Sequence, residues 1–176
     1  MPDFILVIFD SIRDFMDLGG PVLYLIALLL FIMWYMILER IFYFRGPHKK
    51  AVKSALKEWE ARSERRSWAA HQVRHELVSS VAVKMRDNLS MIAACVALAP
   101  LFGLLGTVTG MIEVFQVMAT NGTSDARAMA GGVSRATVPT MAGMVAALSG
   151  LFLSFWLQRK YEQERELLSE HLTLDH

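Results

Sequence analysis

The stretch that decides the fold is MIAACVALAPLFGLLGTVTGMI, residues Met91–Ile112, which runs for 22 residues without a charged side chain. At 1.5 Å per residue, such a helix extends about 33 Å, enough to cross the roughly 30 Å hydrocarbon layer of a bilayer. Pro21–Leu38 (PVLYLIALLLFIMWYMIL) and Ala136–Leu157 (ATVPTMAGMVAALSGLFLSFWL) are uncharged in the same way. A buried helix of a soluble protein would carry a polar stripe. The sequence therefore predicts an all-α membrane protein with three transmembrane helices.

The distribution of positive charge predicts how these helices are oriented. Twelve of the 18 Lys and Arg residues lie between Arg40 and Arg86, two lie in residues 119–135, and three follow Leu157. Cytoplasmic loops carry the excess of Lys and Arg. We therefore expect the long basic loop and the C-terminus in the cytoplasm, and the N-terminus and the loop 119–135 on the periplasmic side.

The first span is expected to be an uncleaved anchor. The 20 residues before it hold four Asp and one Arg, whereas a signal peptide begins with a positive region. Phe4–Met16 has apolar residues at helical spacing with aspartates opposite, which is typical of a helix in the membrane interface. The predicted segments are an interfacial helix (1–18), span one (20–44), a basic cytoplasmic region (45–90), span two (91–118), a periplasmic loop (119–135), span three (136–157) and a cytoplasmic C-terminal helix (158–176).

Two sequence features predict where helices begin and end in the cytoplasmic region. Gly46-Pro47 predicts a break after span one. Ser67 is a candidate N-cap, and no Gly or Pro follows it before Pro100. We therefore expect one helix that runs from Ser67 directly into span two, and span three to continue likewise into the C-terminal helix.

The sequence holds no constellation that predicts an enzyme. Its one cysteine, Cys95, lies inside an apolar stretch and predicts neither a disulfide nor a cysteine-rich metal site. His71 and His75 share a helix face, but the metalloprotease pattern needs Glu where this chain has Gln72. We expect no enzymatic activity, cofactor, metal or nucleic-acid partner.

Spans two and three carry small residues at helical spacing, which let membrane helices approach closely. The predicted packing positions are Gly103, Gly106, Gly110, Gly143, Ala147 and Gly150. Packing within one chain is enough to account for these glycines, but it accounts less well for Thr107, Thr137 and Thr140. These threonines give the two spans a mildly polar face without a titratable group. If several copies surrounded an axis, that face would line a pore.

Two charges flank the outer ends of these spans. Glu113 follows the apolar part of span two, and Arg135 precedes span three. Charges are less costly near the interface than at the centre of the bilayer. They are expected to pair with each other, to contact a partner, or to lie among lipid headgroups.

Two stretches carry a family likeness. GLLGTVTGMI (Gly103–Ile112), preceded by Ala99-Pro100, resembles the second-span signature of the ExbB/TolQ/MotA proton-channel family. SRATVPTMAGMVAAL (Ser134–Leu148) resembles its third-span signature, and Glu39-Arg40 is similar to short members of the ExbB branch. The resemblance covers the whole predicted topology.

This resemblance implies a pentamer in the bacterial inner membrane that surrounds a single-span partner, ExbD, whose transmembrane aspartate carries the proton. It further implies that proton-motive force reaches outer-membrane receptors for iron chelates or vitamins through TonB. Thr107 and Thr140 match the pore threonines of the family. Many relatives have Glu or Gln five residues before the second of these, where this chain has Arg135, which cannot accept a proton.

Two other functions fit the same sequence features. A TolQ-like subunit of an envelope-maintenance complex shares the three-span plan, although the short chain favours ExbB. A membrane scaffold that recruits partners or anionic lipid through the basic stretch Lys49–Arg66 is the alternative from another functional class.

Overall fold

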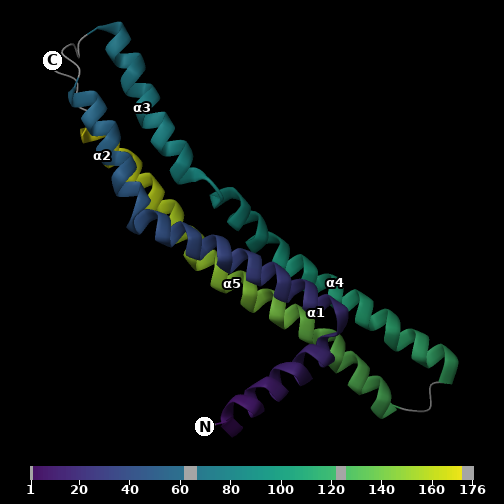
Figure 1. Cartoon of the computed structure of the whole chain (residues 1–176). Coiled ribbons are helices and arrows are strands. Elements are labelled where there is room, and N and C mark those ends of the chain that lie inside the picture. Colours follow the sequence, from purple (N-terminus) through teal and green to yellow (C-terminus); the bar gives the residue numbers. More distant parts are fainter. Residues whose placement is uncertain (1, 62–66, 122–125, 172–176) are drawn as a thin grey trace. The chain divides into compact units, whose positions relative to one another are not determined.

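The computed structural model describes residues 2–61, 67–121 and 126–171, and these residues form helices without a strand (Figure 1). The five helices are α1 (Pro2–Arg45), α2 (Pro47–Glu60), α3 (Trp68–Arg86), α4 (Leu89–Asn121) and α5 (Ala126–His171). Three helical stretches are long and apolar enough to cross a membrane: Phe9–Arg45, Trp68–Thr120 and Met129–His171. The predicted all-α fold with three spans is confirmed. The chain divides into two compact units, residues 1–33 with 94–151 and residues 34–93 with 152–176.

In the first unit, a break at Gly20 divides α1. Gly20 has φ 66° and ψ −165°, a backbone conformation that is essentially restricted to glycine. Pro21 then begins the apolar helix, where its missing N–H group costs little. The break lies at the first residue of the predicted first span (20–44), two residues after the end of the predicted interfacial helix (1–18).

After this break, α1 packs along α4 and α5 in the first unit (Figure 1). Val22, Leu23 and Ile26 of α1 form a buried cluster with Ala99 of α4 and Ala146 of α5. Large apolar side chains on the outside of the unit stay exposed, as expected of a surface that lipid or another chain covers.

The second unit contains α2, α3, the end of α1, the start of α4 and the end of α5. The predicted break at Gly46-Pro47 is confirmed, because α1 ends at Arg45 and α2 begins at Pro47. The predicted N-cap is confirmed too, since the Oγ of Ser67 accepts a hydrogen bond from the backbone N–H of Ala70 at 3.3 Å. α5 contacts α2 through His48–Glu164, and it contacts α3 through a bond from Arg74 to the carbonyl of Ser169.

The structure corrects the expectation of one helix from Ser67 into span two. α3 ends at Arg86 and α4 begins at Leu89, with Asn88 between them at φ 60°. Asn is one of the few residues other than glycine that adopt this left-handed conformation. The helix is therefore broken without Gly or Pro.

The segment predicted as the periplasmic loop, residues 119–135, is largely helical. α4 continues to Asn121 and α5 begins at Ala126. Residues 122–125 lie outside the described part of the chain. The described parts of this segment, residues 119–121 and 126–135, thus belong to the two helices.

Candidate pore-lining face

The seam between α4 and α5 is formed by glycines against backbone. A Cβ added to Gly103 would lie 2.9 Å from the Cα of Thr140, and one added to Gly143 would lie 2.5 Å from the carbonyl oxygen of Ala99. A Cβ on Gly110 would lie 2.7 Å from that of Ala136. No side chain fits at these distances, so the two helices touch along their backbones, as small residues allow in membranes.

The other predicted packing positions contact α1 as well as the seam. A Cβ on Gly106 would meet Pro139 and Val22, and one on Gly150 would meet Met33 and Val96. Ala147 packs against the buried cluster of the first unit. The small residues therefore account for contacts among three helices of one chain.

The predicted pore threonines make different hydrogen bonds. Thr140 donates from its Oγ1 to the carbonyl of Gly103 at 2.8 Å, which joins α5 to α4. Thr107 and Thr137 donate to carbonyls of their own helices, at 2.7 Å and 2.8 Å. Such local bonds satisfy the hydroxyl donor and leave the oxygen free to accept.

Helical geometry places Thr107 and Thr140 on the same side of the seam. Each residue advances about 100° around a helix, so Thr107 lies about 70° to one side of the α4 seam glycines and Phe102 about 70° to the other. The seam residues of α5 are Ala136, Pro139 and Gly143. Thr140 lies about 70° to one side of them and Ala142 about 90° to the other. Phe102 and Ala142 pack against the α1 cluster.

Contacts along the seam run in opposite directions on the two helices, since Gly103 meets Thr140 and Gly110 meets Ala136. When two helices run antiparallel, a rotation away from the seam by the same angle, in the direction of increasing residue number on each helix, leads to the same side of the pair. Thr107 and Thr140 therefore share the side of the α4–α5 pair that α1 leaves open. Both side chains are half-buried, and Thr137 is exposed.

Glu113 and Arg135 do not pair in the chain. Both are exposed, and neither has an ion pair or hydrogen bond among the described residues. By the same helical geometry they lie on the α1 side of the seam, about 50° and 70° from it. These charges are thus separate from the threonine side.

The second unit contains polar clusters that the sequence reasoning missed. His48 is 3% exposed, and its Nε2 lies 3.1 Å from the Oε2 of Glu164. Lys160 binds the other oxygen of that carboxylate at 2.7 Å. Burial raises the pKa of Glu164, but the hydrogen bonds from Lys160 and His48 outweigh this and hold it below its ordinary value. Glu164 lies beyond residue 157, where the predicted third span ends. The i, i+4 spacing of Lys160 and Glu164 is visible in the sequence, whereas the contact of Glu164 with His48 is not, because these two residues lie on different helices.

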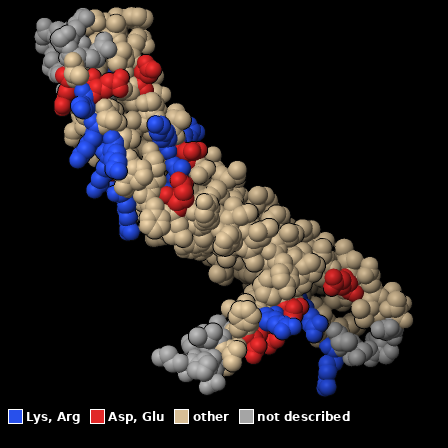
Figure 2. Space-filling model, viewed as in Figure 1, with Lys and Arg blue, Asp and Glu red and all other residues tan. Residues whose placement is uncertain are grey.

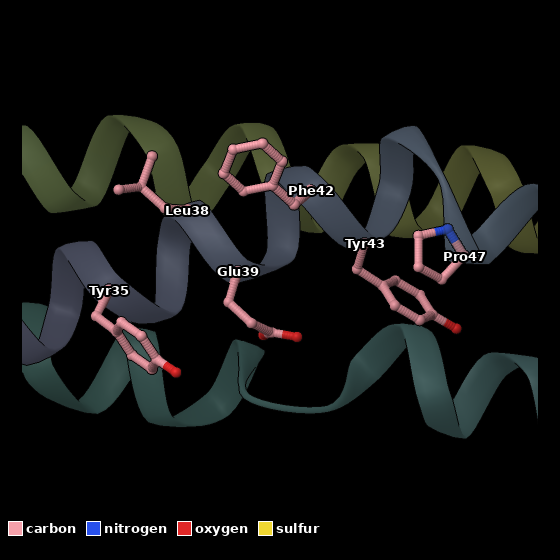
Figure 3. A pocket seen from close by; sticks show the side chains of 6 residues that line it. All are labelled: Tyr35, Leu38, Glu39, Phe42, Tyr43 and Pro47. Atoms are coloured by element: carbon pink, nitrogen blue, oxygen red, sulfur yellow. The ribbon is translucent and has the colours of Figure 1, made fainter.

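A groove of about 540 Å³ lies along the second-unit part of α1 and the start of α2 (Figure 3). It is lined by Tyr35, Leu38, Glu39, Phe42, Tyr43 and Pro47. Three of these six residues are aromatic, and two of the three are tyrosines, a residue type that is enriched at the membrane–water interface. Among the residues that the structure describes, no group of His, Cys, Asp and Glu could hold a metal ion.

Comparisons with known proteins point to one family. The chain is 38% identical over 73 residues to a putative biopolymer transport protein ExbB-like 1 of Synechocystis, which covers 40% of this chain and 29% of that relative. It is 35% identical over 81 residues to the biopolymer transport protein exbB1 of Vibrio cholerae, which covers 43% of this chain and 36% of the relative. The matched stretches thus span about a third of these relatives. The model of the MotA/TolQ/ExbB proton channel family matches residues 45–170, and the chain therefore belongs to this family.

Proposed function

We propose that this chain is an ExbB-type subunit of a proton channel that uses proton-motive force to drive work elsewhere in the cell envelope. Its family and its three apolar helices imply a multi-pass protein of the inner membrane. The observation that carries the proposal is that Thr107 and Thr140 share the side of the α4–α5 pair that α1 leaves open. That side provides hydroxyl groups for a hydrated pathway without a titratable group.

The pore in this proposal is formed by several copies of the chain, a pentamer as in the resemblance above. One chain with three spans does not enclose a conduit. Placing the threonine side toward a central axis leaves α1, with exposed Phe31 and Leu28, toward lipid. Thr107, Thr137 and Thr140 then contribute rings of hydroxyl groups.

The proton-binding acid is proposed to come from another chain. Residues 91–112 and 136–157 contain no Asp or Glu. A transmembrane aspartate on a single-span, ExbD-like partner would supply the group that takes up and releases the proton. A TonB-like protein would then transfer the energy to outer-membrane transport of iron chelates or vitamins.

The proposed topology places the N-terminus and residues 119–135 in the periplasm and the C-terminus in the cytoplasm. In that arrangement Glu113 and Arg135 lie toward the periplasm, where they contact the partner or a neighbouring copy. Their lack of partners within the described chain supports this role.

The test is to purify the chain with and without an ExbD-like partner, to weigh the complexes by native mass spectrometry and to measure proton flux in proteoliposomes. We expect an oligomer that retains the partner and conducts only with it. A monomer that ignores the partner, or an oligomer whose flux is unaffected by removing the partner's aspartate, would contradict the proposal.

A second candidate, a scaffold that recruits a partner through its basic region, is favoured by the surface of α2. Lys and Arg side chains gather on one face there (Figure 2). Lys49, Lys50, Lys53 and Lys57 are exposed and form no ion pair within the described residues. If this were the function, deletion of Lys49–Arg66 would abolish activity while Thr107→Val and Thr140→Val had no effect.

A further inference from the structure

In the turn between α3 and α4, Asn88 has a positive φ, which no other residue except a glycine has in the described part of the chain. The backbone N–H of Leu89 donates to the carbonyl of Asp87 at 2.9 Å, which forms a γ-turn centred on Asn88 at φ 60°. Turns of this form are rare and strained. Such a conformation persists where surrounding contacts fix it, and it is a reason to look for function.

Arg40 of α1 supplies one of these contacts. Its side chain is buried, and its Nη1 donates to the carbonyl of Lys84 at 2.8 Å. The last carbonyls of a helix have no partner within the helix. Arg40 thus caps the end of α3 from another helix.

Glu39 supplies further contacts that hold the turn between α3 and α4. Its carboxylate accepts two bonds from Arg40, at 2.8 Å and 3.2 Å, and one from the Nδ2 of Asn88 at 3.3 Å. Asp87 adds a longer ion pair to Arg40 at 3.8 Å. Figure 3 shows Glu39 extending from α1 toward the teal segment that contains α3 and α4. A single pair of neighbouring residues therefore holds both sides of the turn.

We propose that Glu39 and Arg40 act as a latch that fixes the orientation in which α4 begins, and that Arg40 is a positioning residue for conduction. The carbonyl of Asn88 accepts the first bond of α4, from the N–H of Ile92 at 2.9 Å. α4 then extends from Leu89 to Asn121, with Pro100 inside the helix. This proposal rests on the proposed function, since Thr107 lies on that helix.

The test uses the full chain with its ExbD-like partner and compares Arg40→Leu with Arg45→Leu. Leu fills the buried site with an apolar side chain, and the carboxylates that lose their partner, on Glu39 and Asp87, are 38% and 70% exposed, so neither is left as a buried unpaired charge. Arg45 is the matched control, because it is an exposed arginine of the same helix without an ion pair among the described residues. Asn88→Gly is the milder variant, which keeps the positive φ and loses only the bond to Glu39.

Amide hydrogen exchange in residues 84–92 measures the latch directly, and proton flux measures its consequence. We expect Arg40→Leu to speed exchange about ten- to a hundredfold, as for lost hydrogen bonds to a charged group, with the oligomer mass unchanged and the flux lowered severalfold. Asn88→Gly should fall between Arg40→Leu and wild type.

Exchange in Arg40→Leu equal to that in Arg45→Leu would overturn the latch. Faster exchange with flux equal to that of Arg45→Leu would overturn the positioning role. Absence of flux in the wild-type complex would instead overturn the proposed function, and the exchange data would still decide whether the latch exists.

Discussion

Thr140 and Gly103 are joined across two helices, because the hydroxyl of Thr140 on α5 donates to the backbone carbonyl of Gly103 on α4 at 2.8 Å. This bond exists only because position 103 is a glycine, where a Cβ would lie 2.9 Å from the Cα of Thr140. A predicted pore residue is thus also part of the helix seam. Its substitution therefore affects two properties that must be measured separately.

Thr140→Val should lower both the stability of the helix pair and the proton flux. Interhelical hydrogen bonds in membranes contribute about 0.6 kcal/mol on average and up to about 1.7 kcal/mol. Unfolding in mixed detergent measures the first effect, and a pH-sensitive dye in proteoliposomes measures the second. Thr140→Ser, which keeps the hydroxyl, should leave both the stability and the proton flux near the wild-type values.

Thr107→Val separates the pore role from the seam role. The hydroxyl of Thr107 bonds within α4, to the carbonyl of Leu104, so its loss leaves the contact between the helices intact. We expect reduced flux with unchanged unfolding. Wild-type flux in both Thr107→Val and Thr140→Val would remove the threonine side from the mechanism.

Gly143→Ala should destabilise the protein by about 1–3 kcal/mol, since the added methyl group would lie 2.5 Å from the carbonyl oxygen of Ala99 and the backbones must separate. Gly131→Ala is the matched control on the same helix, because nothing lies within 4 Å of its added Cβ. Unfolding in mixed detergent compares the two. Equal stabilities would show that α4 and α5 do not touch as described.

The way in which the free energy of unfolding falls at acidic pH should depend on Glu164. Its pKa is lowered in the folded protein, so it contributes stability above its unfolded pKa and loses that contribution as the pH falls through the lower folded value. Glu164→Gln should therefore be less stable than wild type at pH 7, with the difference disappearing as the pH falls below about 4.

Glu162→Gln is the control for that experiment, because Glu162 is exposed and has no ion pair among the described residues. It should follow the wild-type profile. If both variants gave the same profile, the contact of Glu164 with Lys160 and His48 would not contribute to stability.

The fold was predictable where a local pattern determines it. Uncharged runs of about 20 residues gave the spans, and Gly46-Pro47 and Ser67 marked helix ends whose chemistry is local. The turn at Asn88 was not predictable, because it is held by Glu39 and Arg40, which lie far away in the chain. The open side of the α4–α5 pair likewise depends on where α1 packs, which a single helical pattern does not determine.

Glu113 and Arg135 offer a test of contact between chains. Both are exposed, of opposite charge and without an ion pair in the described chain, and a charge near the membrane is less costly when it is paired. If neighbouring copies pair them, Glu113→Arg alone should loosen the oligomer through repulsion, and Glu113→Arg with Arg135→Glu should restore it. Native mass spectrometry of the complex, with and without the ExbD-like partner, measures both. Recovery that also occurs without the partner would assign the pair to copies of this chain. Equal dissociation of the single and double variants would show that the two charges meet different groups.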